Sequence, residues 1–283
     1  MGYERPQDLS DALRLLAEGH WRVLAGGTDL YAATSAAQLS GKVIDVTGIP
    51  DIAEIAEEAE GWRLGATATW SQIIAAPLPP AFDALKLAAR EVGAIQIQNA
   101  GTLAGNLCNA SPAADGVPAL LILDAEVELT SRQGRRRLPL SDFIQGPRKT
   151  ALRPEELVTA ILVPKAAAQG DSHFLKLGAR RYLVISIAMV AVRLRVEADS
   201  LVEAALAIGS CSAVARRLPL LEARLRACPL AEAAERLDDG AVATALAPID
   251  DARASGAYRA QAAAELLRRA LYAACRPQSE AAA

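Results

Sequence analysis

The chain has 283 residues, of which 52% are hydrophobic and only 4% aromatic, and its formal net charge at pH 7 is -3. This length allows for about two domains with buried cores. The balanced charge argues against a nucleic-acid or membrane-surface partner, including at the four-arginine segment RQGRRR, which we expect to be a solvated hairpin tip or a patch that docks a partner.

The N-terminus lacks the basic stretch, apolar core and cleavage site that mark a signal peptide. No apolar run reaches the roughly 18 residues of a membrane-spanning helix. A cytoplasmic location without a membrane span is therefore expected.

Few residues of this chain are suited to metal binding or nucleophilic catalysis. Its four cysteines lie far apart without C-x-x-C spacing, which argues against a zinc or iron–sulfur site. We expect them to be reduced thiols, mostly buried. With only two histidines and no G-x-S-x-G motif, the sequence predicts neither a metal site nor a catalytic residue in this chain.

The first 52 residues are predicted to form a small parallel α/β lobe. Apolar residues at helical spacing predict a helix that ends at Ala17, with Gly19 as its stop. A strand at 22–25, a glycine turn, a short helix of small residues and a strand at 42–46 are expected to follow.

Residues 53–168 are predicted to form a mainly antiparallel lobe that carries helices. Two strands are expected to fold back at Gly61, and another hairpin has its basic tip at 134–137. Ser71 is expected to cap a short helix, and a longer helix is expected over 82–92.

Residues 169–283 are predicted to form a separate C-terminal domain from a small antiparallel sheet with helices. At least three strands are expected, with the clearest apolar alternation at 190–196. A helix is predicted over 256–274. The predicted fold class is α+β, with 1–168 as the other domain.

The segment AGGTD, directly after the strand at 22–25, has the composition of an anion site. Gly26 and Gly27 can turn sharply and direct successive backbone N–H groups at a phosphate, with Thr28 and Asp29 as further polar groups. The same residues also suit an ordinary strand-to-helix connection with an N-cap. The segment matches neither G-x-G-x-x-G nor G-x-x-x-x-G-K-[ST], so neither a Rossmann site nor a P-loop is predicted.

The segment GTLAGNLCNASPAAD, from Gly101, is a second candidate. Thr102, Gly105 and Asn106 offer donors to a phosphate, and Asp115 offers an acceptor for sugar-like hydroxyls. Alternatively, the segment is a long loop whose polar side chains satisfy its own turns. Two such loops in one chain suit a diphosphate better than a single phosphate.

Five segments occur in an order that resembles the FAD-binding medium subunit of molybdenum hydroxylases of the xanthine dehydrogenase and carbon monoxide dehydrogenase type. They are AGGTDL, TLAGNLCNASPAADGVPALLILDAEVEL, FIQGPRKTALRPEELVTAILVP, FLKLGARR and AYRAQAAAELLRRAL. The resemblance implies a p-cresol-methylhydroxylase-type FAD-binding fold of two α/β lobes over 1–168. It also implies that 169–283 form the C-terminal domain that is typical of these medium subunits.

The same resemblance assigns FAD-binding residues. In this family two glycine loops hold the FAD diphosphate from opposite sides, Asp115 lies near the ribityl or flavin end, and Lys176 lies beside the ring. Family members usually carry T-x-G-G-N in the second loop, so Ala104 replaces a glycine, which costs little only at negative φ. The implied FAD-binding residues are Val23, Leu24, Ala25, Gly26, Gly27, Thr28, Asp29, Leu30, Thr102, Leu103, Ala104, Gly105, Asn106, Asp115, Val158 and Lys176.

The implied function is electron transfer within a heteromeric enzyme. The resemblance implies a large molybdenum-cofactor subunit and a small subunit with two [2Fe-2S] clusters as partners, in a dimer of heterotrimers. FAD on this chain would receive electrons from the small subunit and pass them to an external acceptor, with Lys176 as a cation that favours the reduced flavin. Two alternatives are a self-sufficient flavin oxidase or dehydrogenase of the same fold and a non-catalytic nucleotide-binding assembly protein.

Overall fold

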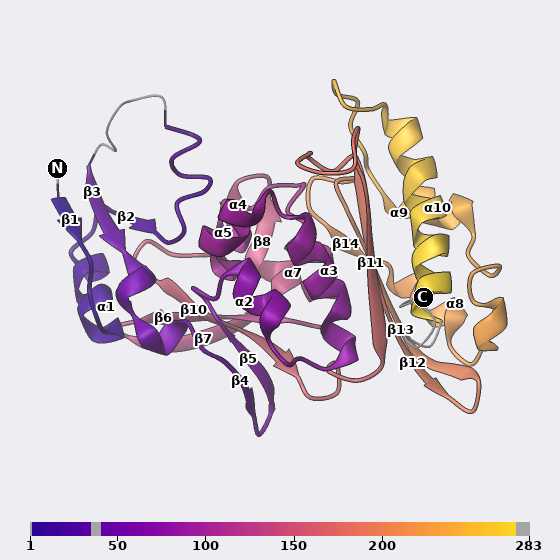
Figure 1. Ribbon diagram of the computed structural model, residues 1–283, viewed down its shortest axis with the longest axis horizontal. Coiled ribbons are helices and arrows are strands. Elements are labelled where there is room, and N and C mark those ends of the chain that lie inside the picture. Colours follow the sequence, from indigo (N-terminus) through magenta and orange to yellow (C-terminus); the bar gives the residue numbers. More distant parts are fainter. Residues whose placement is uncertain (1, 35–40, 276–283) are drawn as a thin grey trace.

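The N-terminal part of the chain forms a three-stranded parallel sheet in the computed structural model, which describes residues 2–34 and 41–275 (Figure 1). The sheet has the order β1-β3-β2, so its first and second strands are both paired with the third. The strand β1 was not expected, because three residues are too few for a recognisable alternation. The elements are β1 (Gly2–Glu4), α1 (Leu9–Ala17), β2 (Trp21–Leu24) and β3 (Lys42–Asp45), followed by the 3-10 helices η1 (Val46–Gly48) and η2 (Pro50–Ile52).

The predicted first helix is confirmed as α1. Asp8 is its N-cap and accepts a hydrogen bond from the backbone N–H of Asp11 at 2.8 Å. The helix buries its apolar face, including Leu13 and Leu16, and Gly19 follows its end at φ +79°.

The short helix expected between the first two predicted strands is absent from residues 27–34, the part of it that the structure describes, which corrects that expectation. Between Gly27 and Thr34 the chain makes isolated turns, in which Tyr31 N–H donates to Gly27 O and Ala33 N–H donates to Asp29 O. A run of small residues offers too little apolar surface to hold so short a helix. The rest of the expected helix, up to Ala37, lies outside the described residues.

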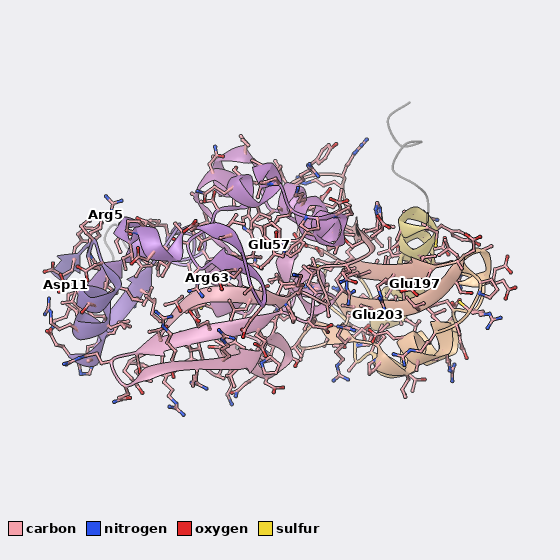
Figure 2. The ribbon with its side chains drawn as sticks, turned by 90° about the horizontal axis from the view of Figure 1, so that it is seen from below. Arg5, Asp11, Glu57, Arg63, Glu197 and Glu203 are labelled. Carbon is pink, nitrogen blue, oxygen red and sulfur yellow. The ribbon has the colours of Figure 1, made fainter. Side chains whose placement is uncertain are left out.

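The middle part of the chain forms an antiparallel sheet, as predicted, and this sheet has five strands in the order β4-β5-β10-β6-β7. Both predicted hairpins are present, one turning before Gly61 and one before Gly134. On this sheet, Arg63, which is labelled in Figure 2, donates to the buried carboxylate of Glu128 at 2.8 Å. The strands are β4 (Ile55–Glu58), β5 (Gly61–Gly65), β6 (Glu126–Ser131), β7 (Gly134–Pro139) and β10 (Leu157–Pro164), with a small separate pair, β8 (Ile144–Gly146) and β9 (Lys149–Thr150).

Helices gather between this sheet and the C-terminal part of the chain (Figure 1). The predicted helix over 82–92 is confirmed as α3, but Ser71 is not a cap. Thr69 caps α2 instead, in a capping box with Gln72, because the helix begins earlier than its apolar pattern suggests. The elements are α2 (Trp70–Ala75), η3 (Pro80–Phe82), α3 (Asp83–Glu91), α4 (Ile95–Ala100), α5 (Leu103–Asn109), α6 (Gly116–Leu121) and α7 (Leu140–Phe143).

The C-terminal part forms a four-stranded antiparallel sheet of order β11-β12-β13-β14, with helices on both of its faces (Figure 1). Alternate residues of β12 enter different cores: Met189 and Ala191 pack with the middle helices, whereas Val190 and Val192 pack with α10. The predicted helix over 256–274 matches α10 at both ends. The elements are β11 (Asp171–Leu177), β12 (Ala188–Glu197), β13 (Ser200–Gly209), β14 (Arg216–Arg217), α8 (Pro219–Leu225), η4 (Leu230–Glu232), α9 (Asp239–Ala245) and α10 (Gly256–Ala274).

Two arginines of the C-terminal sheet hold the end of α6. Arg193, fully buried on β12, donates to Ile122 O at 2.8 Å and pairs with Glu203, which lies on the C-terminal sheet (Figure 2). Arg217 donates to Leu121 O at 2.7 Å. These contacts tie the C-terminal sheet to the helix that begins directly after Asp115. Of the described helices, none combines the length and the apolarity needed to cross a bilayer.

Candidate functional site

A pocket of about 900 Å³ opens between the N-terminal lobe, the middle helices and the start of the C-terminal sheet. Its volume lies near the upper end of the range for small-molecule and cofactor sites. Both candidate loops line it, together with Asp115, Val158 and Lys176. The fold therefore brings nearly all residues of the implied FAD site to one place, although more than 150 positions separate the first from the last.

The first loop owes its shape to its two glycines. A Cβ on Gly26 would overlap the backbone carbonyl oxygen of Ala100, so only glycine lets the two loops approach this closely. Gly27 has φ +71°, and a Cβ there would lie 2.5 Å from the Tyr31 ring. Among the described residues, no acceptor is found for the N–H groups of residues 27–30. The loop thus presents unpaired donors at the pocket, as an anion site requires.

The second loop is the start of α5, and most of its backbone donors are already used. Leu103 N–H donates to Ala68 O at 2.9 Å, and Ala104 N–H donates to Ala66 O at 3.0 Å. Gly105 N–H donates at 3.2 Å to the hydroxyl oxygen of Thr102, the N-cap of the helix. The Gly105 N–H is therefore already paired within the helix cap. The remaining polar groups of this loop are the Thr102 hydroxyl proton and the Asn106 side chain.

Within the second loop, Ala104 lines the pocket, whereas Leu103 does not. Ala104 lies in the first turn of α5 and has no positive φ, so the alanine replaces a glycine without backbone strain. It also lines the pocket. Leu103, by contrast, is fully buried in the hydrophobic core and does not line the pocket, because its side chain points to the opposite side of the helix from Gly105.

Replacing Thr102 with alanine should lower the free energy of unfolding by about 1 kcal/mol, because α5 loses its N-cap bond. Urea denaturation of the full chain measures this. The matched control is Thr244→Ala in α9, whose exposed hydroxyl bonds only to Gly240 O and which should change stability little. Equal stability of the Thr102 variant and the control would contradict the capping role.

Asp115 and Lys176 form a buried ion pair at one side of the pocket. The Lys176 Nζ lies 2.7 Å from Asp115 Oδ2, and 6% and 9% of the two side chains are exposed. Lys176 also donates to Glu91 O at 3.3 Å, and the Ser186 hydroxyl donates to Asp115 Oδ1 at 2.6 Å. Burial raises the pKa of the Asp115 carboxyl above its ordinary value, while Lys176 and Ser186 oppose that rise.

The pocket is also lined by residues that the sequence did not point out. Arg148 has φ +59°, and its guanidinium donates to both the backbone carbonyl oxygen and the side-chain amide oxygen of Asn109. Its position after a glycine and a proline is a turn signal, but nothing local reveals the contact with Asn109. Val158, as implied, lines the same pocket. Further lining residues that the sequence did not single out are Ala66, Thr67, Trp70, Cys108, Leu152, Leu157, Val184 and Ile185.

The cysteines agree with the prediction in part. All four are free, and Cys211 and Cys228 are buried, while Cys275 is half-buried. Cys108, by contrast, is exposed on the pocket wall, which corrects the expectation of burial for this cysteine. Among residues 2–34 and 41–275, no cluster of His, Cys, Asp and Glu could hold a metal ion.

Both parts of the chain match known protein families. Residues 1–166 match the family described as the FAD binding domain in molybdopterin dehydrogenase, and residues 173–274 match the CO dehydrogenase flavoprotein C-terminal domain. The nicotinate dehydrogenase FAD-subunit of Eubacterium barkeri is 37% identical over 170 residues, which cover 58% of this chain and 57% of that relative. The putative xanthine dehydrogenase FAD-binding subunit of Escherichia coli is 32% identical over 213 residues, 73% of each chain.

Superposition on solved structures indicates the same family. A chain of the reconstituted CO dehydrogenase from Oligotropha carboxidovorans superposes with a TM-score of 0.90 at 27% identity, and the match covers 97% of both chains. The predicted α+β fold, an FAD-binding part followed by a sheet-and-helix C-terminal part, is thereby confirmed.

The pocket fits the cofactor of that family. Its first loop offers unpaired N–H groups beside a glycine that no other residue can replace, and the buried Asn106 Oδ1 has no hydrogen-bond partner among the described residues. Unpaired buried polar atoms are rare unless a ligand or water satisfies them. The family match over more than half of the chain, the relatives and the superposition agree with this chemistry, and the chain belongs to the family of FAD-binding medium subunits of molybdenum hydroxylases.

Proposed function

We propose that this chain is the FAD-bearing electron-transfer subunit of a molybdenum hydroxylase and that the pocket described above binds the FAD. One observation carries the proposal: the two glycine loops, Asp115, Val158 and Lys176 all line the same pocket. They come from five separate segments of the chain, so their convergence depends on the whole fold.

Under this proposal the first loop holds the FAD diphosphate with the N–H groups of residues 27–30. The Thr102 hydroxyl and the Asn106 side chain bind from the other side, which explains why the second loop needs no free backbone donors. Asp115 and Lys176 face the ribityl or flavin end, and Val158 supplies an apolar surface. The proposed FAD-binding residues are those implied by the resemblance, with the exception of Leu103.

When bound, FAD can accept electrons singly or in pairs and release them to an acceptor. The chain contributes position and charge. Lys176 has three N–H donors, of which Asp115 and Glu91 O use two, so one is left for a ligand. Asp115 limits the positive charge that Lys176 presents to the pocket. Trp70 and Val158, both nearly fully buried, exclude water from the wall of the pocket.

We further propose that the chain works with a large molybdenum-cofactor subunit and a small subunit with two [2Fe-2S] clusters, in a cytoplasmic dimer of heterotrimers. Electrons would reach the FAD from the small subunit and leave to an external acceptor. A relative named as the carbon monoxide dehydrogenase medium chain, from Afipia carboxidovorans, supports a multi-subunit enzyme. The two family matches support domains at 1–168 and 169–283.

Purification of the complex from its native cell tests this function. We expect the full chain to carry FAD, identified by its absorption spectrum, and to elute with two other chains that carry molybdenum and iron. Reduction of the complex with its substrate should bleach the FAD absorbance. Turnover of an organic substrate by this chain alone, or a chain that takes up no FAD on reconstitution, would overturn the proposal.

A further inference from the structure

A hydrogen-bonded chain of residues leads from Asp115 into the C-terminal domain, away from the pocket. Its first member is Ser186, which is 1% exposed and lies just before β12. The Ser186 hydroxyl donates to Asp115 Oδ1 at 2.6 Å, whereas Lys176 occupies the other oxygen, Oδ2. Each carboxylate oxygen thus has its own donor, one from β11 and one from the segment before β12.

The backbone on both sides of that hydroxyl is held by arginines. Arg253 donates to Ser186 O at 3.1 Å, and the buried Arg259 donates to Ile187 O at 2.6 Å. Both arginines share one carboxylate, since Arg253 binds Asp251 Oδ2 at 2.6 Å and Arg259 binds Asp251 Oδ1 at 2.7 Å. We call Asp251, Arg253 and Arg259 the arginine clamp.

The arginine clamp has no direct contact with the pocket. None of its three residues lines the pocket, and they lie in and before the first turns of α10, more than 60 positions after Ser186. Its donors reach two successive carbonyl groups, which fixes the backbone orientation of Ser186 and Ile187. Removal of a backbone anchor on either side would let the Ser186 hydroxyl turn away from Asp115.

We propose that Ser186 is a positioning residue for the Asp115–Lys176 pair and that the arginine clamp holds its hydroxyl at Asp115 Oδ1, where the hydrogen bond stabilises the charged carboxylate. The C-terminal domain thereby sets the charge that the flavin end of the pocket experiences. This inference rests on the proposed FAD site, but its first test does not need FAD.

The charges around Asp115 determine the direction in which loss of the Ser186 hydroxyl shifts the pKa of Asp115. Lys176 on β11 faces Asp115 and lowers its pKa, whereas the charge of Glu91 at the end of α3 raises its pKa. Burial already raises the pKa of Asp115, so the loss of the Ser186 hydroxyl raises it further. At a pH below the raised pKa, Asp115 is neutral and the charge of Lys176 is uncompensated. A more positive pocket favours the anionic reduced flavin.

The first test compares Ser186→Ala with the unmodified chain, both full-length and free of FAD, by urea denaturation at several pH values. We expect the destabilisation to be largest where Asp115 is ionised and to shrink as the pH falls through its pKa. The control is Ser172→Ala on β11, whose hydroxyl bonds only to Ala84 N–H and Pro80 O, so its effect should not depend on pH. A pH-independent effect of Ser186→Ala would overturn the inference.

The second test uses the FAD-loaded full chain. Ser186→Ala should shift the flavin midpoint potential upward at acidic pH and add a bend to its pH dependence, while Ser172→Ala leaves both unchanged. Arg253→Gln should give the same changes more weakly, and it serves in place of Ser186→Ala if that variant does not fold. A chain without FAD would refute the proposed site, whereas bound FAD with unchanged potentials would refute the role of Ser186.

Discussion

Gly26→Ala is expected to weaken FAD binding by about 100-fold, or about 3 kcal/mol, in the full-length chain. The added methyl group would occupy the position of the Ala100 carbonyl oxygen, which is backbone and cannot rotate away. The first loop must therefore move away from α4 and the second loop, and its N–H groups lose their place at the pocket. Titration of FAD into the apoprotein, followed by flavin fluorescence, measures the loss.

Gly146→Ala is the matched control for this prediction. It lies on β8, and its added Cβ would meet only Lys149 Cβ, at an ordinary contact distance of 4.0 Å. FAD affinity should remain at the level of the unmodified chain. Urea denaturation of both variants separates a displaced loop from general unfolding. If Gly26→Ala binds FAD as tightly as Gly146→Ala, the first loop does not hold the diphosphate.

Lys176→Met is expected to destabilise the FAD-free chain by about 3 kcal/mol at neutral pH, because it leaves the buried Asp115 carboxylate without its cation. In the FAD-loaded chain it should lower the flavin midpoint potential, since a positive charge beside the reduced flavin is lost, and leave FAD occupancy mostly intact. Urea denaturation and potentiometric titration measure the two effects. An unchanged potential would remove Lys176 from the flavin environment.

The pH dependence of this variant follows from Asp115. Without Lys176, burial is opposed only by Ser186, so the pKa of Asp115 in the folded chain rises further above its value in the unfolded chain. Between these two pKa values the folded state binds more protons, so the free energy of unfolding should fall as the pH rises. The double variant Asp115→Asn with Lys176→Met should recover much of the stability and lose this dependence. A single variant whose stability is independent of pH would contradict the buried pair.

The prediction from the sequence was most accurate where neighbouring residues decide the structure. The boundaries of α10 follow from its repeating apolar positions and the Ser255 cap, and the hairpin before Gly134 follows from alternation around a turn. It failed where a short segment depends on its neighbours in space. The strand β1 exists because β3 pairs with it, and the helix expected after Gly27 is replaced by turns in the described residues.

The amino-acid sequence alone was enough to name the candidate residues of a flavin-nucleotide site. Glycines in a turn, a capping threonine and one lysine are recognisable in their local context, and family resemblance placed them in one site. Their partners are visible only in the folded chain: the backbone N–H groups of the second loop are paired, Lys176 forms an ion pair with Asp115, and Ser186 donates to the same carboxylate. These contacts join residues up to 71 positions apart, and hydrogen bonds of such span leave no periodic pattern in a sequence.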